Sequence, residues 1–146
     1  RFAEAGRMPE KIQEFCRETK QQVPETPGET IRCIYESLAL RYAEVWEKLP
    51  NYIDEAPDCL HIVGGGCQDK LLNQFTANAL GTRVYAGPIE ATGLGNIIAQ
   101  MMADGVINTL AEGREIVAAS FPVDTYEPSD SASWDAVKER FALLSV

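Results

Sequence analysis

The pattern of apolar and polar positions predicts a chain rich in amphipathic helices. It is strongest over about 29–49, where apolar side chains recur every three or four residues and charged side chains fill the positions between them. The apolar positions are Ile31, Ile34, Tyr35, Leu38, Tyr42, Val45, Trp46 and Leu49. We therefore expect one long amphipathic helix over this stretch.

Shorter stretches with the same spacing predict further helices. Prolines and a glycine within 23–28 end the first of them, because neither residue continues a helix there. Thr109 with Glu112 has the spacing of a capping box, which is typical of a helix start. The predicted helices cover 9–21, 69–80, 91–103, a short segment after Thr109, and a last segment that opens at Ser131 or Ser133 and carries Trp134, Val137, Phe141 and Leu144.

Three consecutive glycines stand between a predicted strand and a predicted helix. The apolar run 59–63 precedes Gly64, Gly65 and Gly66, and the helix 69–80 follows them and stops at Gly81. A second short strand, 82–86, ends at Gly87 and Pro88. Two strands joined by one helix and short turns predict a parallel βαβ unit. The segment 121–128 is also expected to be extended.

The predicted elements are unbalanced, with many helices and two clear strands. A two-stranded parallel sheet is not a stable core by itself, so we expect the missing strands in sequence that lies outside this chain or on another chain. The first residue is Arg1 and not Met, which fits processing, trimming or a fragment of a larger protein. The apolar surface of such a truncated sheet is expected to favour self-association.

The helix predicted over 91–103 has one stripe of large apolar residues and one stripe of small residues. Small side chains every fourth position indicate that another element, or the edge of a ligand, packs closely against this backbone. The large apolar stripe consists of Leu94, Ile97, Ile98, Met101 and Met102, and the small stripe consists of Ala91, Gly95, Ala99 and Ala103.

Composition and charge exclude several classes of protein. Apolar residues make up 45% of the 146 residues and the net charge is −9, which is ordinary for a globular domain and unfavourable for binding nucleic acid. No apolar run is long enough to span a membrane. The charged helical pattern of the first residues is not that of a signal peptide, so we expect a cytoplasmic protein with reduced thiols.

The cysteines and the single histidine do not predict a metal site or a nucleophile. Four cysteines without a CxxC pair and one histidine make zinc improbable. Cys16 and Cys33 lie on neighbouring predicted helices and are expected to be close, bridged or not. A Cys67–His61 pair is conceivable, but Cys67 is more simply a small residue under the turn, and His61 a buried core histidine. We expect no catalytic residue and no metal ligand in this chain.

The glycine turn is the strongest candidate for a ligand site. Glycines between a strand and a helix let a flat ligand approach bare backbone, and a helix start offers unpaired N–H groups. The alternative is a tight turn that needs positive φ. The turn has neither the G-x-G-x-x-G fingerprint, since Asp69 occupies its last position, nor a P-loop. Asp69 is most simply the helix N-cap, and Glu90 is expected to cap the next helix.

Two segments resemble the C-terminal domain of the FGGY carbohydrate kinases. They are HIVGGGCQDKLLNQ, from position 61, and GTRVYAGPIEATGLGNIIAQ, from position 81. The family pattern is a strand, glycines, a helix with Asn-Gln, a short strand, and Glu-Ala before a glycine and an alanine-rich helix. Here these elements are residues 64–66, Asn73 with Gln74, Val84 with Tyr85, and Glu90 with Ala91 and Gly95. The residues at 67–68, 94–97 and 31–40 favour the members that phosphorylate L-rhamnulose.

This resemblance implies an α/β fold of the ribonuclease H-like, actin/hexokinase-like class, with ATP and Mg²⁺ held in a cleft between two domains. It implies transfer of phosphate from ATP to L-rhamnulose in rhamnose catabolism, or to another ketose of the xylulose or fuculose type. Gly64, Gly65 and Gly66 match the family's adenosine motif, so we expect them to bind ATP, with Gly65 as the central contact.

The family's catalytic aspartate, N-terminal phosphate turn and sugar-binding residues lie upstream of the matched segments. Residues 1–146 are therefore interpreted as the C-terminal portion of the nucleotide-binding domain, without the N-terminal sugar-binding domain and inactive alone. A non-catalytic nucleotide-binding or interaction module remains the alternative from another class.

Overall fold

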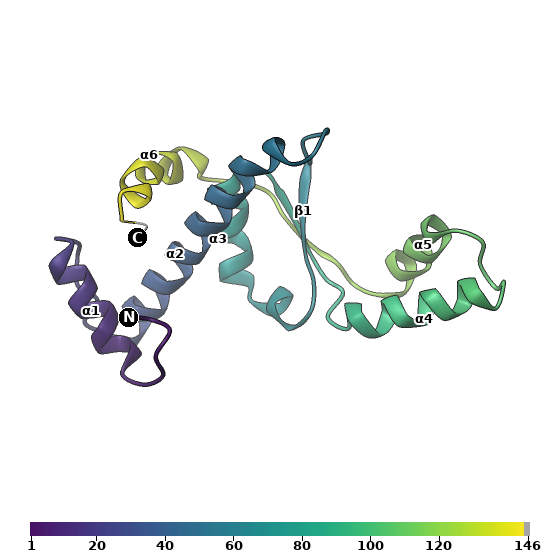
Figure 1. Ribbon diagram of the computed structural model, residues 1–146, viewed down its shortest axis with the longest axis horizontal. Coiled ribbons are helices and arrows are strands. Elements are labelled where there is room, and N and C mark those ends of the chain that lie inside the picture. Colours follow the sequence, from purple (N-terminus) through teal and green to yellow (C-terminus); the bar gives the residue numbers. More distant parts are fainter. Residues whose placement is uncertain (145–146) are drawn as a thin grey trace.

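The computed structural model of the protein describes residues 1–144, and it is rich in helix around a small sheet (Figure 1). The predicted helices and both predicted strands are present, with ends that differ by a few residues. In chain order the elements are α1 (Met8–Glu18), α2 (Pro27–Lys48), the short 3₁₀ helix η1 (Leu49–Asn51), β1 (Cys59–Ile62), the 3₁₀ turn η2 (Gly65–Gln68), α3 (Lys70–Leu80), β2 (Arg83–Ala86), α4 (Ala91–Ala103), α5 (Leu110–Ser120), β3 (Asp124–Tyr126) and α6 (Ser131–Ala142).

The sheet has three strands in the order β1-β2-β3. Strands β1 and β2 are parallel and are joined through α3, which confirms the predicted βαβ unit. The extended segment expected at 121–128 contributes β3, which pairs antiparallel to β2 and makes the sheet mixed. Within residues 1–144, β1 has no partner on its other side, so it is an edge strand.

The core lies between α2, α3 and one face of the sheet. Ala39 and Ala43 of α2 are buried against Ala79 of α3, and small side chains let the two helices approach closely. Val84 of β2 is fully buried. Phe75, Leu80 and Trp134 pack around this cluster, and the rings of Phe75 and Trp134 lie 5.2 Å apart between centroids. Helix α6 thereby closes one end of the core.

Helix α2 begins earlier than expected and buries a different side. Thr26 caps it by accepting a hydrogen bond from the Glu29 amide, and the Glu29 carboxylate accepts in return from the Thr26 amide, so Pro27 and Gly28 open the helix. Its buried positions are Thr30, Ala39, Leu40 and Ala43. Much of the predicted apolar stripe is exposed, namely Ile31 (50%), Leu38 (37%), Tyr42 (40%) and Val45 (52%), because the contact with α3 follows the alanines instead.

Helix α3 buries several polar side chains. Leu71 is exposed, whereas Asn73, Thr76, Ala77 and Asn78 are buried beside Ala79. Within residues 1–144, the Oδ1 atom of Asn73 is buried without a hydrogen-bond partner. Two of the buried polar side chains find partners close by: Thr76 donates to the Leu72 carbonyl oxygen over 2.7 Å, and Asn78 Oδ1 accepts from Gln74 Nε2 and from the Ser129 amide. Apolar spacing does not detect buried polar residues that are satisfied in this way.

Helices α4 and α5 form a hairpin that projects from the sheet, at the opposite end of the molecule from α1 (Figure 1). Ile98 is buried at their contact, directly beside Gly113 of α5. The predicted capping residue Thr109 is confirmed, because its hydroxyl accepts from the Glu112 amide. Glu90 stands at the N-cap position of α4 but makes no side-chain capping bond, so that prediction was wrong.

The close packing expected along the small stripe of α4 does not occur within residues 1–144. Gly95, Ala99 and Ala103 are exposed, and a Cβ built on Gly95 would meet no atom within 4 Å. In the large apolar stripe, Ile98 is buried, whereas Ile97 and Met102 are exposed. Helix α5 packs against α4 at Ile98.

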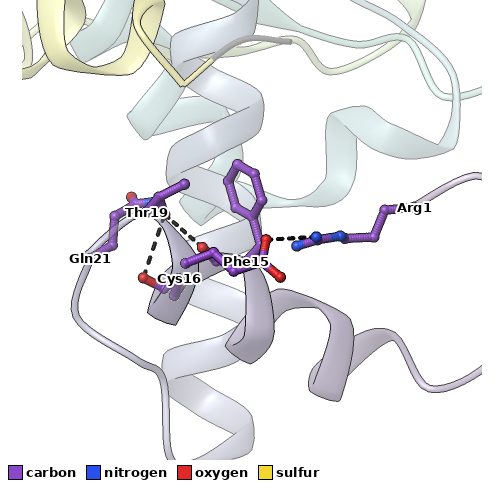
Figure 2. Close-up of polar contacts among 6 residues, drawn as sticks. Arg1, Phe15, Cys16, Thr19 and Gln21 are labelled. Carbon is purple, nitrogen blue, oxygen red and sulfur yellow. Dashed lines mark hydrogen bonds and ion pairs between the residues drawn. The ribbon is translucent and has the colours of Figure 1, made fainter.

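Helix α1 ends in a compact set of polar contacts (Figure 2). The Thr19 hydroxyl donates to the Phe15 carbonyl oxygen over 2.6 Å and accepts from Gln21 Nε2 over 2.8 Å. The amide of Gln21 donates to the Cys16 carbonyl oxygen over 2.8 Å. These bonds satisfy the last carbonyl groups of α1 and fix Cys16 against α2.

None of the helices in residues 1–144 has the length and apolar character that crossing a bilayer requires.

Candidate functional site: the glycine turn

The three glycines form an open turn at the carboxyl end of β1. Gly64 has φ 79° and ψ −170°, a conformation that only glycine adopts without strain. Gly65 and Gly66 begin the 3₁₀ turn η2. Positive φ is therefore required at the first glycine but not at the other two. The interpretation as a tight turn accounts for Gly64 alone.

Two backbone hydrogen bonds join the turn to the segment that leads into α4. The Gly64 amide donates to the Pro88 carbonyl oxygen over 3.1 Å, and the Gly87 amide donates to the Ile62 carbonyl oxygen over 2.8 Å. The turn is thus held at its root by the neighbouring strand. Its tip is left free.

The tip of the turn presents bare backbone. Gly65 and Gly66 are exposed, and a Cβ built on either would meet no atom within 4 Å. Within residues 1–144, neither amide donates a hydrogen bond. A flat ring can approach this unobstructed glycine backbone closely, and the two free N–H groups can donate to phosphate oxygens.

Asp69 occupies the start of α3, as predicted for an N-cap. One carboxylate oxygen accepts from the Leu72 amide over 3.0 Å, and the other accepts from the hydroxyl of Tyr35 on α2. The Tyr35 hydroxyl, followed by the Leu72 amide, lowers the pKa of Asp69, and the same contact raises the pKa of Tyr35. The Asp69 side chain occupies the Leu72 amide at the α3 N-terminus, so this amide is not available to a ligand. The donors come from the turn itself.

The underside of the turn is buried. Cys67 is 6% exposed, which confirms its interpretation as a small residue under the turn. Its carbonyl oxygen accepts from Asn73 Nδ2 over 2.8 Å, and Asn73 is fully buried on α3. This bond ties the end of η2 to the helix behind it.

His61 is not the buried core histidine that was expected. Its side chain is exposed and stacks on Tyr85 of β2, with ring centroids 5.0 Å apart. Successive residues of a strand face opposite sides of a sheet. Leu60 and Ile62 therefore face α2 and α3, while His61 faces the opposite side of the sheet.

Two apolar cavities flank the turn. One, of about 380 Å³, lies between α2, α3 and β1, and Gly66 and Asn73 are part of its lining. The other, of about 780 Å³, lies between the ends of β1 and β2 and the α4–α5 hairpin, beside Val63 and Pro88. An apolar recess with a few backbone donors at its edge is a common setting for a small ligand.

The cysteines are free thiols, and two of them are neighbours. Cys16 on α1 and Cys33 on α2 line the same cavity of about 450 Å³. Burial, and next the adjacent Cys16 thiol, raise the pKa of Cys33 to about 11. The expected proximity of this pair is confirmed, and the structure has no bridge between them.

Within residues 1–144, no three His, Cys, Asp or Glu side chains gather as they would around a metal ion. Asp69 is the carboxylate nearest to the turn in sequence, and both of its oxygens already accept hydrogen bonds. The residues present at the turn therefore do not fit Mg²⁺.

Sequence reasoning missed two residues at this site. Tyr35 was assigned to an apolar stripe, and Asn73 was noted as part of a motif without a structural role. The contact of Tyr35 spans 34 positions in sequence, so no local spacing reveals it. A buried asparagine in an amphipathic pattern leaves a weak signal, namely a polar residue on the side that faces the core.

Comparison with known protein families and with curated proteins finds matches of both kinds. Residues 3–103 match the family model described as the FGGY family of carbohydrate kinases, C-terminal domain. A rhamnulokinase of Bacteroides thetaiotaomicron is 47% identical over 140 residues, which cover 96% of this chain and 29% of that relative. The chain thus spans less than a third of the length of the relative.

Proposed function

Because this chain belongs to the FGGY family of carbohydrate kinases, we propose that it supplies the adenosine-binding wall of an ATP-dependent ketose kinase. Its fold is part of the actin/hexokinase-like ATPase fold, as expected from the sequence. A kinase of this family binds ATP and a sugar. The contacts that we assign to the nucleotide are Gly64, Gly65 and Gly66.

The observation that carries this proposal is the open tip of the glycine turn. The amides of Gly65 and Gly66 are unbonded within residues 1–144, and the space above them is empty. A side chain here would obstruct a nucleotide, whereas the free amides can donate to its phosphates. The small side chains along α4, which nothing in the described part of the chain covers, are consistent with an incomplete cleft.

The sugar that we propose is L-rhamnulose. The support is the 47% identity with a protein named rhamnulokinase. The reaction would move the terminal phosphoryl group of ATP to the sugar and give L-rhamnulose 1-phosphate. Another ketose of the xylulose or fuculose type is the alternative, because the segment that selects the sugar is not among the matched residues.

We further propose that the chain alone is inactive. Phosphoryl transfer requires a positioned base and metal-held phosphates on both sides of a cleft. The turn supplies backbone donors but neither a free carboxylate nor a metal site. An upstream sugar-binding domain would provide them, in a protein as long as the relative. Purified chain incubated with ATP, Mg²⁺ and L-rhamnulose should form no detectable ADP above background.

The direct test of the nucleotide site is an NMR titration of the 146-residue chain with ATP. We expect shifts of the amides of residues 64–72, with a dissociation constant in the millimolar range because one wall buries only part of the ligand. Gly65→Ala tests the ligand contact without disturbing the fold, since its added Cβ meets no atom within 4 Å. It should abolish the shifts and leave the fold intact.

Absence of shifts in the wild-type chain has two explanations that the complete kinase separates. If Gly65→Ala in the complete enzyme raises the KM for ATP at least tenfold, the glycines bind the nucleotide but need the opposite wall. If the variant leaves KM and kcat unchanged, the turn has no nucleotide role and the assignment is wrong.

A further inference from the structure

The Tyr35–Asp69 contact restrains a negatively charged side chain that closely follows the open glycine amides in sequence. Asp69 follows η2 immediately, and its own amide donates to the Gly66 carbonyl oxygen over 3.2 Å. Its carboxylate is thus the anion nearest in sequence to the two free N–H groups. An unrestrained carboxylate at this position would compete for them, because charged acceptors form the strongest hydrogen bonds with amides.

The structure restrains this carboxylate from two directions. The Leu72 amide, in the first turn of α3, holds one oxygen at 3.0 Å, and the Tyr35 hydroxyl holds the other. Within residues 1–144, this is the one side-chain hydrogen bond between α2 and the segment 64–80. Tyr35 itself is held by its helix, which packs on α3 through Ala39 and Ala43.

We propose that Tyr35 is a positioning residue for the nucleotide: its hydroxyl keeps the Asp69 carboxylate turned toward α2, so that the Gly65 and Gly66 amides stay available to phosphate. This inference rests on the proposed function of the turn. It assigns to α2, a helix without a residue in the glycine motif, control over the affinity for the charged part of ATP. The lowered pKa of Asp69 agrees with a carboxylate held in its charged form by this donor.

The test compares Tyr35→Phe with the control Tyr52→Phe. Tyr52 follows η1 and is 82% exposed, and within residues 1–144 its hydroxyl has no hydrogen-bond partner, so loss of that hydroxyl should leave ATP binding unchanged. Tyr35→Phe keeps the ring and removes the hydroxyl, which is one of the two restraints on the Asp69 carboxylate. We expect ATP to bind about fivefold more weakly, the effect of one modest hydrogen bond, while adenosine binds as before because it carries no phosphate.

A double variant separates positioning from simple loss of structure. Asp69→Ser keeps a helix-capping oxygen but has no carboxylate and is too short to reach Tyr35. In the Tyr35→Phe background it should restore the affinity for ATP, since the competing anion is gone. If the double variant binds ATP no better than Tyr35→Phe alone, or if ATP and adenosine weaken equally, the inference is wrong.

A measurement without nucleotide keeps this inference separate from the proposed function. In Tyr35→Phe, the Leu72 amide still holds one oxygen of Asp69, and the oxygen that Tyr35 no longer holds should bond the Gly65 and Gly66 amides and slow their exchange with solvent, measured by NMR. A merely structural loss would make these amides exchange faster. Slower exchange supports the inference, and it does so even if the wild-type chain binds no ATP. Failure of the wild-type chain to bind ATP would count against the proposed function alone. Faster or unchanged exchange overturns the inference.

Discussion

At the scale of single residues, the three glycines of the turn have different reasons to be glycine. Gly64 is fixed by its backbone conformation, whereas Gly65 and Gly66 have ordinary conformations and open space above them. Stability and ligand access are therefore separable within three consecutive positions. Substitution by alanine distinguishes them.

Gly64→Ala should destabilise the chain by about 1–3 kcal/mol, because alanine is strained at this φ and ψ. Gly65→Ala should change the free energy of unfolding by less than about 0.5 kcal/mol. Urea unfolding followed by circular dichroism measures both. Equal losses in the two variants would show that the turn needs glycine for its fold throughout, and would remove the argument for a ligand.

The Asp69 cap gives a pH dependence whose sign follows from its lowered pKa. A carboxyl whose folded pKa lies below the unfolded value of about 3.9 stabilises the fold above that pH. The contribution is lost as the pH falls through the lower folded value. We expect the free energy of unfolding to drop below about pH 4 in the wild-type chain, and Asp69→Asn to remove part of that slope. Parallel curves for the two proteins between pH 2 and 6, a window set around the pKa of about 3.9, would contradict this.

At the scale of elements, local signals were predictable and burial was not. Apolar spacing located the helices, and the caps at Asp69 and Thr109 followed from side chains three residues from their targets. Which side of a helix is covered depends on partners far away in sequence. Spacing alone therefore could not predict which stripe of α2 is buried, which side of β1 His61 faces, or the contact of Tyr35. It could predict the candidate turn.

The α4–α5 hairpin offers a test of packing at this scale. A Cβ on Gly113 would lie 2.6 Å from Ile98 Cγ2, and Ile98 is buried. Overpacking costs about 1–3 kcal/mol, which exceeds the gain of about 1 kcal/mol that alanine brings to a helix. Gly113→Ala should therefore destabilise the hairpin.

Gly95→Ala is the control, because it is exposed on α4 and its Cβ would meet no atom within 4 Å. It should stabilise the helix by about 0.5–1 kcal/mol. Amide exchange of α4 and α5 reports on both variants. A stabilising Gly113→Ala would mean that the hairpin packs more loosely than the structure indicates.

At the scale of the whole molecule, the chain exposes apolar surface that its own elements do not cover. Ile31, Leu38, Tyr42 and Val45 lie exposed along α2, and β1 is an edge strand within residues 1–144. Contiguous apolar surface and an unpaired edge both favour association with another chain. Self-association thus remains a prediction with a defined surface.

Sedimentation velocity at increasing concentration should show dimers or larger species for the wild-type chain. The double variant Leu38→Glu with Val45→Glu should shift the population toward monomer, because both positions are already exposed and tolerate charge. Val106→Glu, at a position that is 66% exposed between α4 and α5, is the matched control and should leave association unchanged. A monomeric wild-type profile at all concentrations removes the prediction.

The two backbone bonds that join Gly64 to Pro88 and Gly87 to Ile62 have a consequence for how the parts of the molecule communicate. They place the root of the α4–α5 hairpin and the root of the glycine turn in one hydrogen-bonded unit. We therefore expect a ligand that shifts the turn to shift the hairpin as well. Thermodynamic linkage makes the relation reciprocal: a contact that fixes the hairpin changes the affinity at the turn by the same factor.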